Sequence, residues 1–243
     1  DNSWGDLSSV REDVAAVRQA LENQGFLVET LLDPTEDALL EKINDFIDQY
    51  GYEQENRLLF YYAGHGHTQE RNGRKFGYLV PVDAPNPYDN ERAFYQKSLK
   101  MEQILSWAKQ IESKHILFVF DSSFSDSGLQ TSQVTFPEDI SYQTPKPVRQ
   151  FISSGTASYT IADKGVFRPL FIRGIKGEAD LNQDGYVTGT ELGMYLQQQV
   201  PQFQTGQTPY YGKLPDPDNE GNFVFEAISS NQPKLKIMKL YIG

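Results

Sequence analysis

Apolar residues occur along this chain in two patterns: short continuous runs, and longer segments in which they recur every three or four positions. The continuous runs predict buried β-strands, and the spaced pattern predicts amphipathic helices. The expected strands cover residues 26–33, 57–66, 76–83, 115–120, 149–154, 222–227 and 234–243. The expected helices cover about residues 9–24, 35–50, 99–111, 166–176 and 189–199. Strands that alternate with helices predict βαβ units, and therefore an α/β fold with a mainly parallel sheet covered on both faces.

One segment, residues 122–147, departs from both patterns. It is rich in Ser, Thr and Pro and has no clear periodicity. We expect a long loop here, of the kind that is usually functional or mobile.

Composition narrows the class of protein. The 243 residues suffice for one large domain or two small ones, and 38% of them are apolar, which indicates a folded globular protein. The formal net charge is −11 and the basic residues do not cluster. This balance argues against nucleic acid or an anionic membrane as a partner and favours a cationic substrate or a metal ion.

Two absences in the sequence add to this picture. The chain has no cysteine, which excludes disulfides, zinc–thiolate sites and a thiol nucleophile. No apolar run approaches the roughly 18 residues of a membrane span, and no signal peptide is visible, so a cytoplasmic protein is expected. Because the chain begins at Asp1 and not at Met, we expect a processed or trimmed piece.

Two of the most apolar runs end in residues that can do chemistry. "RLLFYYAGHG" places His65 between two glycines, and "HILFVFDSSFSDSG" delivers Asp121, Ser122 and Ser123 directly after a buried strand. Open α/β sheets bind ligands at the carboxyl ends of their strands, and a His near a Ser outlines a base and a nucleophile. Taken singly, each of these residues is more often structural; the pair at equivalent strand ends favours a site.

These strand ends also carry a resemblance. "FYYAGHG" followed by "DSSFS" is similar to the His-Gly and Asp-x-Cys-x-Ser motifs of caspase-like peptidases of clan CD, specifically the prokaryotic metacaspase relatives called orthocaspases. The similarity extends to "EDVAAVRQALENQGFLVETLLDPT", "RQFISSG", "GEADLNQDGYVTGTELGMYL" and "YYGKLPDPDNEGNFVFE". It implies a caspase-haemoglobinase fold, with a mainly parallel six-stranded sheet between helices. A single domain over 1–243 would then have a p20-like part at about 1–130 and a p10-like part at about 148–227.

The resemblance also implies roles for individual residues. His65 matches the general base, and Gly66 matches the residue whose N–H helps to hold the oxyanion. Asp121 matches the acid at the floor of the specificity pocket, where a carboxylate pairs with a substrate guanidinium. The implied substrate is a basic peptide or protein cleaved after Arg or Lys. In an active form, self-cleavage is expected in the 122–147 loop, with Lys146 and Arg149 as candidate positions.

Ser123 stands where the family has its nucleophilic cysteine. A hydroxyl is far less acidic than a thiol and needs a base oriented by a third group, and a site shaped for sulfur misplaces the shorter C–O bond. We therefore expect a caspase-like cysteine endopeptidase domain that is catalytically silent in this form. The serine is either that of a natural pseudo-protease or a replacement of cysteine. The alternatives are a scaffold that binds basic partners, a calcium-responsive regulatory module, and a serine hydrolase using Ser123 and His65.

A second candidate site lies in the sequence "DLNQDGYVTGTE", residues 180–191, which matches the twelve-residue calcium loop. The expected Ca²⁺ ligands are Asp180, Asn182, Asp184, the Tyr186 carbonyl, Thr188 and Glu191. Gly185 would make the sharp turn. The alternative is a metal-free turn between two helices, since a single hand often binds weakly. Proteins of the resembling family are frequently stimulated by calcium, although through a separate acidic site.

The two chain ends suggest an unusual order of elements. The family begins with an apolar strand, whereas this chain begins with "DNSWGDL" and ends with "KLKIMKLYIG". Joined end to end, the two would read as a normal family opening. We expect residues 234–243 to supply the family's first strand, between 26–32 and 57–62; the alternative is a trimmed N-terminus and an unrelated final strand.

Overall fold

The structure is a computed structural model that describes Trp4 and residues 10–122, 144–155, 165–216, 218–227 and 236–242. Of the residues at 10, 11 and 236–242, the backbone alone is described. None of the helices in these ranges has the length and apolar character needed to cross a membrane.

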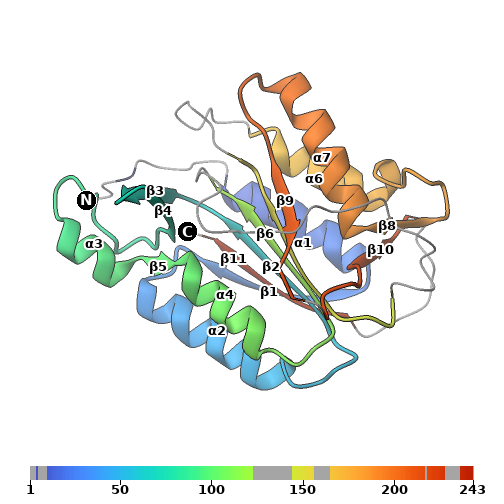
Figure 1. Ribbon diagram of the computed structural model, residues 1–243, viewed down its shortest axis with the longest axis horizontal. Helices are drawn as coiled ribbons and strands as arrows, with labels where there is room; N and C mark the ends of the chain where they lie inside the picture. The colour runs from blue at the N-terminus through green and yellow to red at the C-terminus, as the bar shows by residue number, and fades with distance from the viewer. Residues whose placement is uncertain are drawn as a thin grey trace.

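A six-stranded sheet forms the centre of the described part of the molecule (Figure 1). In spatial order its strands are β1 (Phe26–Leu32), β11 (Lys236–Ile242), β2 (Arg57–Ala63), β6 (His115–Asp121), β7 (Val148–Ser153) and β9 (Tyr210–Lys213). Neighbouring strands are parallel except β7 and β9, which are antiparallel. The expected α/β fold with a mainly parallel six-stranded sheet is confirmed.

The C-terminal strand β11 lies inside this sheet. It pairs in parallel with β1, where Lys236 is opposite Phe26, and with β2, where Ile237 is opposite Leu58. A strand from the end of the chain therefore joins two strands from its first quarter. The expected position of this strand between residues 26–32 and 57–62 is confirmed, whereas its assignment as the family's first strand stays a prediction.

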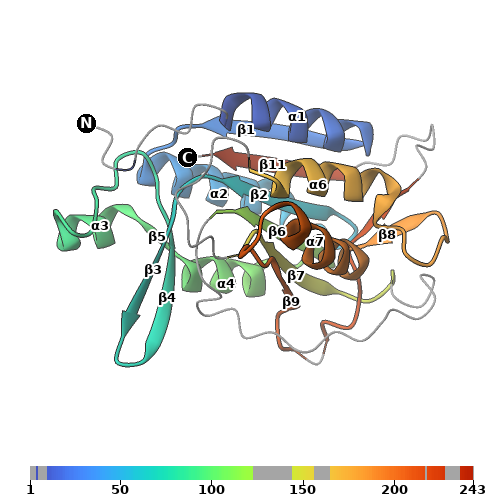
Figure 2. The ribbon, with the colours of Figure 1, turned by 90° about the horizontal axis from the view of Figure 1, so that it is seen from above.

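Helices cover both faces of the sheet (Figure 2). On one face lie α1 (Val10–Asn23), α6 (Phe167–Arg173), its π-helical continuation η1 (Gly174–Glu178), and α7 (Gly189–Phe203). On the other lie α2 (Glu36–Tyr50) and α4 (Met101–Gln110). Because helices cover both faces of β2 and β6, the side chains that alternate between these faces are buried on either side. This explains the continuous apolar runs of the two strands.

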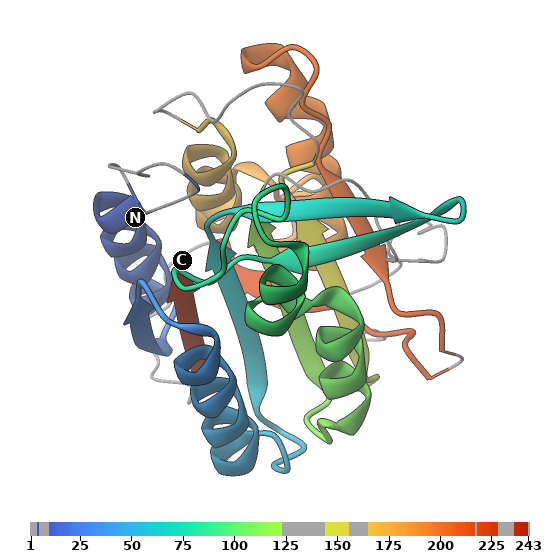
Figure 3. The same ribbon diagram turned by 90° about the vertical axis from the view of Figure 1, so that its left-hand side faces the viewer.

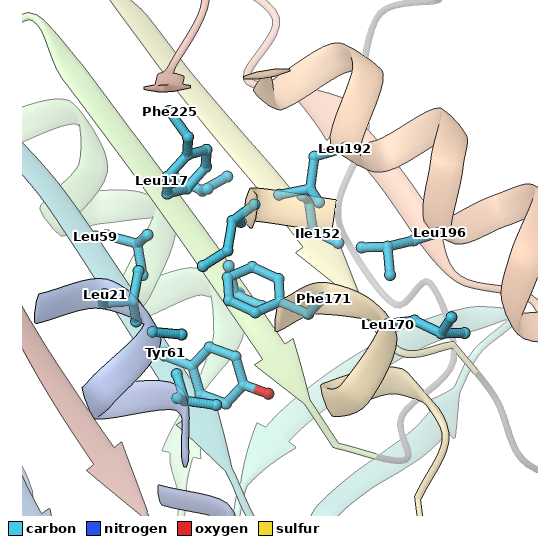
Figure 4. Close-up of a cluster of buried hydrophobic side chains, with 14 of the residues drawn as sticks. Leu21, Leu59, Tyr61, Leu117, Ile152, Leu170, Phe171, Leu192, Leu196 and Phe225 are labelled. Carbon is cyan, nitrogen blue, oxygen red and sulfur yellow. The ribbon is translucent and has the colours of Figure 1, made fainter. Parts of the chain in front are cut away.

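The two sides of the sheet hold separate apolar clusters. Leu59 and Tyr61 of β2 face the cluster with α1, α6 and α7, whereas Leu58 and Phe60 face the one with α2 and α4. Figure 4 shows the first cluster, in which the ring of Tyr61 lies beside Phe171 of α6. Together the two clusters hold the central strands in place and so fix their carboxyl ends.

A small antiparallel sheet follows β2 and projects beyond the main sheet (Figure 3). It consists of β3 (Gly66–Arg71), β4 (Arg74–Leu79) and β5 (Leu99–Lys100), and α3 (Glu91–Lys97) precedes β5. The expected strand at 76–83 is wrong in its bounds, and β3 and α3 were not expected. β3 is polar and partly exposed, so its sequence lacks the alternation of apolar and polar residues that indicates a strand. The Asn72-Gly73 turn, at positive φ, was the signal that could have revealed this hairpin.

A third, two-stranded sheet joins β8 (Tyr186–Thr188) to β10 (Val224–Glu226) in antiparallel pairing. β8 leads directly into α7, so the candidate calcium loop begins shortly after η1 and ends in the first turn of α7. The pairing of Val187 with Phe225 attaches the loop to the segment that follows β9.

Candidate active site

The carboxyl ends of β2 and β6 bring the predicted site residues to one edge of the sheet. Ala63, the last residue of β2, pairs with Asp121, the last residue of β6. The N–H of Gly64 donates to the carbonyl of Asp121 at 3.3 Å, and His65 and Gly66 follow at the start of β3. The structure thus places His65 and Gly66 beside Asp121. Ser123 lies outside the described residues.

The backbone of His65 is held by β2 and by the residue that follows β4. Its carbonyl accepts a hydrogen bond from the Val80 N–H at 3.1 Å and lies 2.9 Å from the Tyr62 hydroxyl, which donates to it. The His65 imidazole contacts the indole of Trp4, with 5.7 Å between the ring centroids and 38° between the planes. The His65 backbone is therefore tied to the strands, while its ring contacts an aromatic neighbour from the start of the chain.

The Asp121 carboxylate is enclosed by protein, although the residue as a whole is not fully buried. Burial raises the pKa of Asp121 to about 6, and the hydroxyl of Tyr61, which donates to Oδ2 at 3.2 Å, partly opposes this shift. Among the described residues that hydroxyl is the one hydrogen-bond partner of the carboxylate. A neutral partner leaves a buried negative charge uncompensated, so the site favours a cation.

Two tyrosines in β2 were missed by the sequence analysis. Tyr61 and Tyr62 are adjacent and point to opposite faces of the sheet, yet the hydroxyl of one reaches Asp121 and that of the other reaches His65. The signal was present as two tyrosines within an apolar run directly before "AGHG", since a buried Tyr hydroxyl usually finds a polar partner.

The end of β6 is joined to the end of β7 by Ser122 and Ser154. The N–H of Ser122 donates to the Ser154 Oγ at 3.1 Å, and that hydroxyl donates to the Ser122 carbonyl at 3.2 Å. The carbonyl of Ser154 accepts from Gln207 at 2.8 Å. These bonds fix the backbone immediately before position 123. By contrast, the Ser122 Oγ is buried and none of the described residues forms a hydrogen bond with it.

The two candidate self-cleavage positions differ. Lys146 lies before β7 and forms an ion pair with Glu220. Arg149 lies within β7, opposite Ile116, and its guanidinium donates to the carbonyls of Ala108, Ile111 and Lys114. A strand residue held in this way cannot extend into an active site, so the expectation for Arg149 is wrong for the folded chain.

The candidate calcium loop has the turn shape that its sequence predicts. Gln183 and Gly185 have φ values of 60° and 86°. The two carboxylate oxygens of Asp180 accept the N–H groups of Asp184 and Gly185, at 3.1 and 3.0 Å. Asn182 also accepts the Asp184 N–H at 3.0 Å. The backbone path of the loop therefore fits a calcium loop.

The side chains of this loop are occupied within the protein. Oε2 of the buried Glu191 accepts the N–H and the hydroxyl of Thr188, in a capping box at the start of α7, and Oε1 accepts the Leu181 N–H at 3.3 Å. Asp184 accepts the N–H of Tyr186 at 2.9 Å. In the ranges that the structure covers, no three His, Cys, Asp or Glu side chains are grouped so as to hold a metal ion. Calcium would have to compete with these bonds for the same oxygens.

A buried polar network, also missed by the sequence analysis, connects this loop to β7. Gln150 of β7 donates to Tyr211 and to Asn222, each at 2.7 Å, and accepts the Phe223 N–H. Thr190, in the first turn of α7, bonds to the same Tyr211 and Asn222. The signal in the sequence was a single Gln within the apolar strand "RQFIS".

Comparison with known proteins settles the family. A family model described as caspase domain matches residues 2–207. The chain belongs to the caspase-domain family. The α/β architecture with its mainly parallel central sheet agrees with the caspase-haemoglobinase fold. The assignment to the orthocaspase type stays a prediction.

Two mammalian proteins are also similar to this caspase domain. They are the mucosa-associated lymphoid tissue lymphoma translocation protein 1 of Homo sapiens and its homolog of Mus musculus. Each is 35% identical over 114 residues, which cover 45% of this chain. The matched region spans 12% of the length of either relative.

Proposed function

We propose that the edge formed by β2 and β6 is a peptidase-type site for basic peptides, in which Asp121 binds an Arg or Lys side chain. The observation that carries the proposal is the enclosed Asp121 carboxylate, whose pKa is raised by burial and whose one described partner is a neutral hydroxyl. A guanidinium would supply the missing opposite charge and charge-assisted hydrogen bonds. The net charge of −11 would also attract cationic peptides.

The neighbouring groups have roles in the same proposal. His65 takes the proton of the nucleophile at position 123 as that atom bonds to the scissile carbonyl carbon. It then gives the proton to the amine as the C–N bond breaks, which leaves the acyl group on the nucleophile; a water molecule that gives its proton to His65 then attacks this group and releases it as a carboxylic acid, and the nucleophile regains its proton. The Gly66 N–H stabilises the oxyanion between these steps. With a serine at position 123, we propose that the chain binds basic peptides and turns them over slowly or not at all.

The test uses the full chain and its Ser123→Cys variant. With fluorogenic peptides ending in Arg, Lys or Asp, the variant is expected to cleave after Arg and Lys at least about 10²-fold faster than the parent. Ser123→Ala serves as the control without a nucleophile. Cleavage after Asp would contradict the assignment of Asp121.

Binding is measured separately by fluorescence anisotropy with a labelled Arg peptide. The parent chain is expected to bind it, and Asp121→Asn to lose that binding. Asp37→Asn removes the same charge from an exposed side chain and serves as the matched control. Retained binding without cleavage by Ser123→Cys would favour a scaffold, and equal turnover by parent and variant would favour a serine hydrolase.

Calcium binding by residues 180–191 is a second candidate function. The observations in its favour are the backbone turn at Gln183 and Gly185 and the position of Glu191 in the first turn of α7. We expect calorimetry to detect Ca²⁺ but not Mg²⁺ binding, and Asp180→Asn to abolish it, with Asp216→Asn as a control outside the loop. No heat with Ca²⁺ would leave the loop as a metal-free turn.

A further inference from the structure

Trp4 is attached to the protein at several points. Its Nε1–H donates to the carbonyl of Ala84 at 2.9 Å, and its ring centroid lies 6.0 Å from that of Phe94 and 6.0 Å from that of His67. Phe94 is fully buried and itself contacts His67, with 5.1 Å between centroids. The indole therefore has a defined place in an ordered group of side chains.

We name this group the aromatic cluster. Its buried members come from β4, the turn after it and α3, and its partly buried members pack around them. They are Tyr78, Val80, Ala84 and Phe94, with Trp4, Phe76 and Tyr95. The cluster is separate from the two large cores of the main sheet. Because its member Val80 also donates its N–H to the His65 carbonyl, the cluster connects Trp4 to the backbone that carries His65.

Two parts of His65 are restrained by neighbouring residues: its backbone carbonyl and its imidazole ring. Its main-chain carbonyl is fixed by Tyr62 and Val80, while its ring lies beside that of Trp4, with 5.7 Å between the centroids and a tilt of 38°. Hydrogen bonds to the backbone carbonyl do not by themselves set the rotation of the ring about its side-chain bonds, whereas a packed aromatic neighbour limits that rotation. The ring plane decides which direction the imidazole nitrogens face.

We infer that Trp4 is a positioning residue for His65, holding the imidazole plane in the orientation needed for proton transfer. This inference rests on the proposed role of His65 as the general base. A proton passes efficiently only when donor and acceptor are aligned, and a small displacement of either lowers the rate steeply. Trp4 acts through the histidine ring and has no proton of its own to exchange with the nucleophile.

The first experiment needs no catalysis and uses the parent chain. The sequence has three histidines, so NMR signals of the imidazole ring protons can be assigned with single substitutions. The expected result is a ring-current shift on His65 that is lost in Trp4→Leu and largely kept in Trp4→Phe. Leu fills part of the space without a ring, and Phe restores an aromatic face without the hydrogen bond to Ala84. Unchanged His65 signals in Trp4→Leu would overturn the inference.

The second experiment measures peptide cleavage in the Ser123→Cys variant. Adding Trp4→Leu is expected to lower kcat about 10- to 100-fold and leave KM within about twofold, and Trp4→Phe is expected to recover most of the rate. His67→Phe is the matched control, since it keeps a ring against Trp4 and Phe94; both kcat and the His65 signals should remain. A rise in KM with unchanged kcat would instead make Trp4 a wall of a substrate subsite and overturn the inference.

Together the two experiments distinguish a failure of the proposed function from a failure of the inference about Trp4. If Ser123→Cys cleaves nothing, the proposed function fails, while the NMR comparison still decides whether Trp4 orients the ring. If Trp4→Leu lowers the melting temperature and kcat together, Trp4→Phe decides: recovery of stability without recovery of kcat would show a structural role alone and overturn the inference.

Discussion

The edge of β2 and β6 and the loop at 180–191 are both polar, yet they satisfy their polar groups in opposite ways. At the edge, the described part of the chain gives the enclosed Asp121 carboxylate one neutral partner and the buried Ser122 hydroxyl none. In the loop, Asp180, Asp184 and Glu191 accept N–H groups from the loop itself.

This difference has a physical meaning for ligand binding. A buried carboxylate without a cation costs free energy, and a ligand of opposite charge recovers that cost. A carboxylate that already accepts backbone N–H groups stabilises the fold without a ligand, and a metal must first compete with those bonds. On this ground we expect a cation to stabilise the charged Asp121 carboxylate, whereas the loop keeps its shape by itself.

The largest expected effect tests whether the edge is a catalytic site. In the Ser123→Cys variant, His65→Ala should lower the rate of peptide cleavage about 10²- to 10⁴-fold, because the general base is removed. The melting temperature should change little, and His67→Phe should retain the rate. Equal losses from both substitutions would show that the edge is sensitive to packing and not to the base.

Asp121→Asn tests whether the carboxylate destabilises the fold when charged. Its folded pKa of about 6 lies above the ordinary value of 3.8, so the folded state keeps a proton that the unfolded state releases. The contribution of Asp121 to the free energy of unfolding therefore falls as the pH rises from about 4 to 6, and above that range the charged carboxylate destabilises the fold. Asp121→Asn should raise the free energy of unfolding by about 1–3 kcal/mol at pH 7 and much less near pH 4.

Urea unfolding at the two pH values checks this prediction, with Asp37→Asn as the surface control. A stability gain that is equal at both pH values would mean that the carboxylate is not desolvated in the native state.

Gly185→Ala tests whether the loop is held by its backbone. Gly185 has a φ of 86° and open space where a Cβ would lie, so the cost arises from the backbone conformation alone. We expect a loss of about 1–2 kcal/mol in the free energy of unfolding. Gly165 also has open space but no positive φ, and Gly165→Ala should be nearly neutral. Similar losses in the free energy of unfolding from Gly185→Ala and Gly165→Ala would show that the positive φ of Gly185 does not hold the loop.

The smallest expected effect is that of Tyr61→Phe. The Tyr61 hydroxyl lowers the pKa of Asp121 against the larger effect of burial, so its removal should raise that pKa by a further fraction of a unit, worth about 1 kcal/mol or less. NMR titration of the Asp121 carboxyl carbon measures the change, and binding of an Arg peptide near pH 6 should weaken. An unchanged titration would mean that the hydrogen bond contributes little to the charge at this edge.

Much of the fold could be predicted from apolar periodicity. The buried strands at 57–63 and 115–121 were found because both of their faces are covered, which leaves continuous apolar runs. β3 was missed because a projecting, partly exposed hairpin needs no apolar alternation. β9, at the edge of the sheet, has four residues, too few to show a period.

Some features of the candidate site could likewise be predicted from the sequence, and others could not. Sequence alone determined which residue types stand at the strand ends, because a buried run that stops at His65 or Asp121 is a local pattern. It also determined the turn of the loop at 180–191, because that turn depends on neighbouring residues. The place of β11 between β1 and β2 was expected from the two chain ends, whereas only the tertiary structure decided that Tyr61 contacts Asp121 and that Trp4 contacts His65. These contacts join segments far apart in the chain, and parallel pairing and packing across a sheet leave no local trace in the sequence.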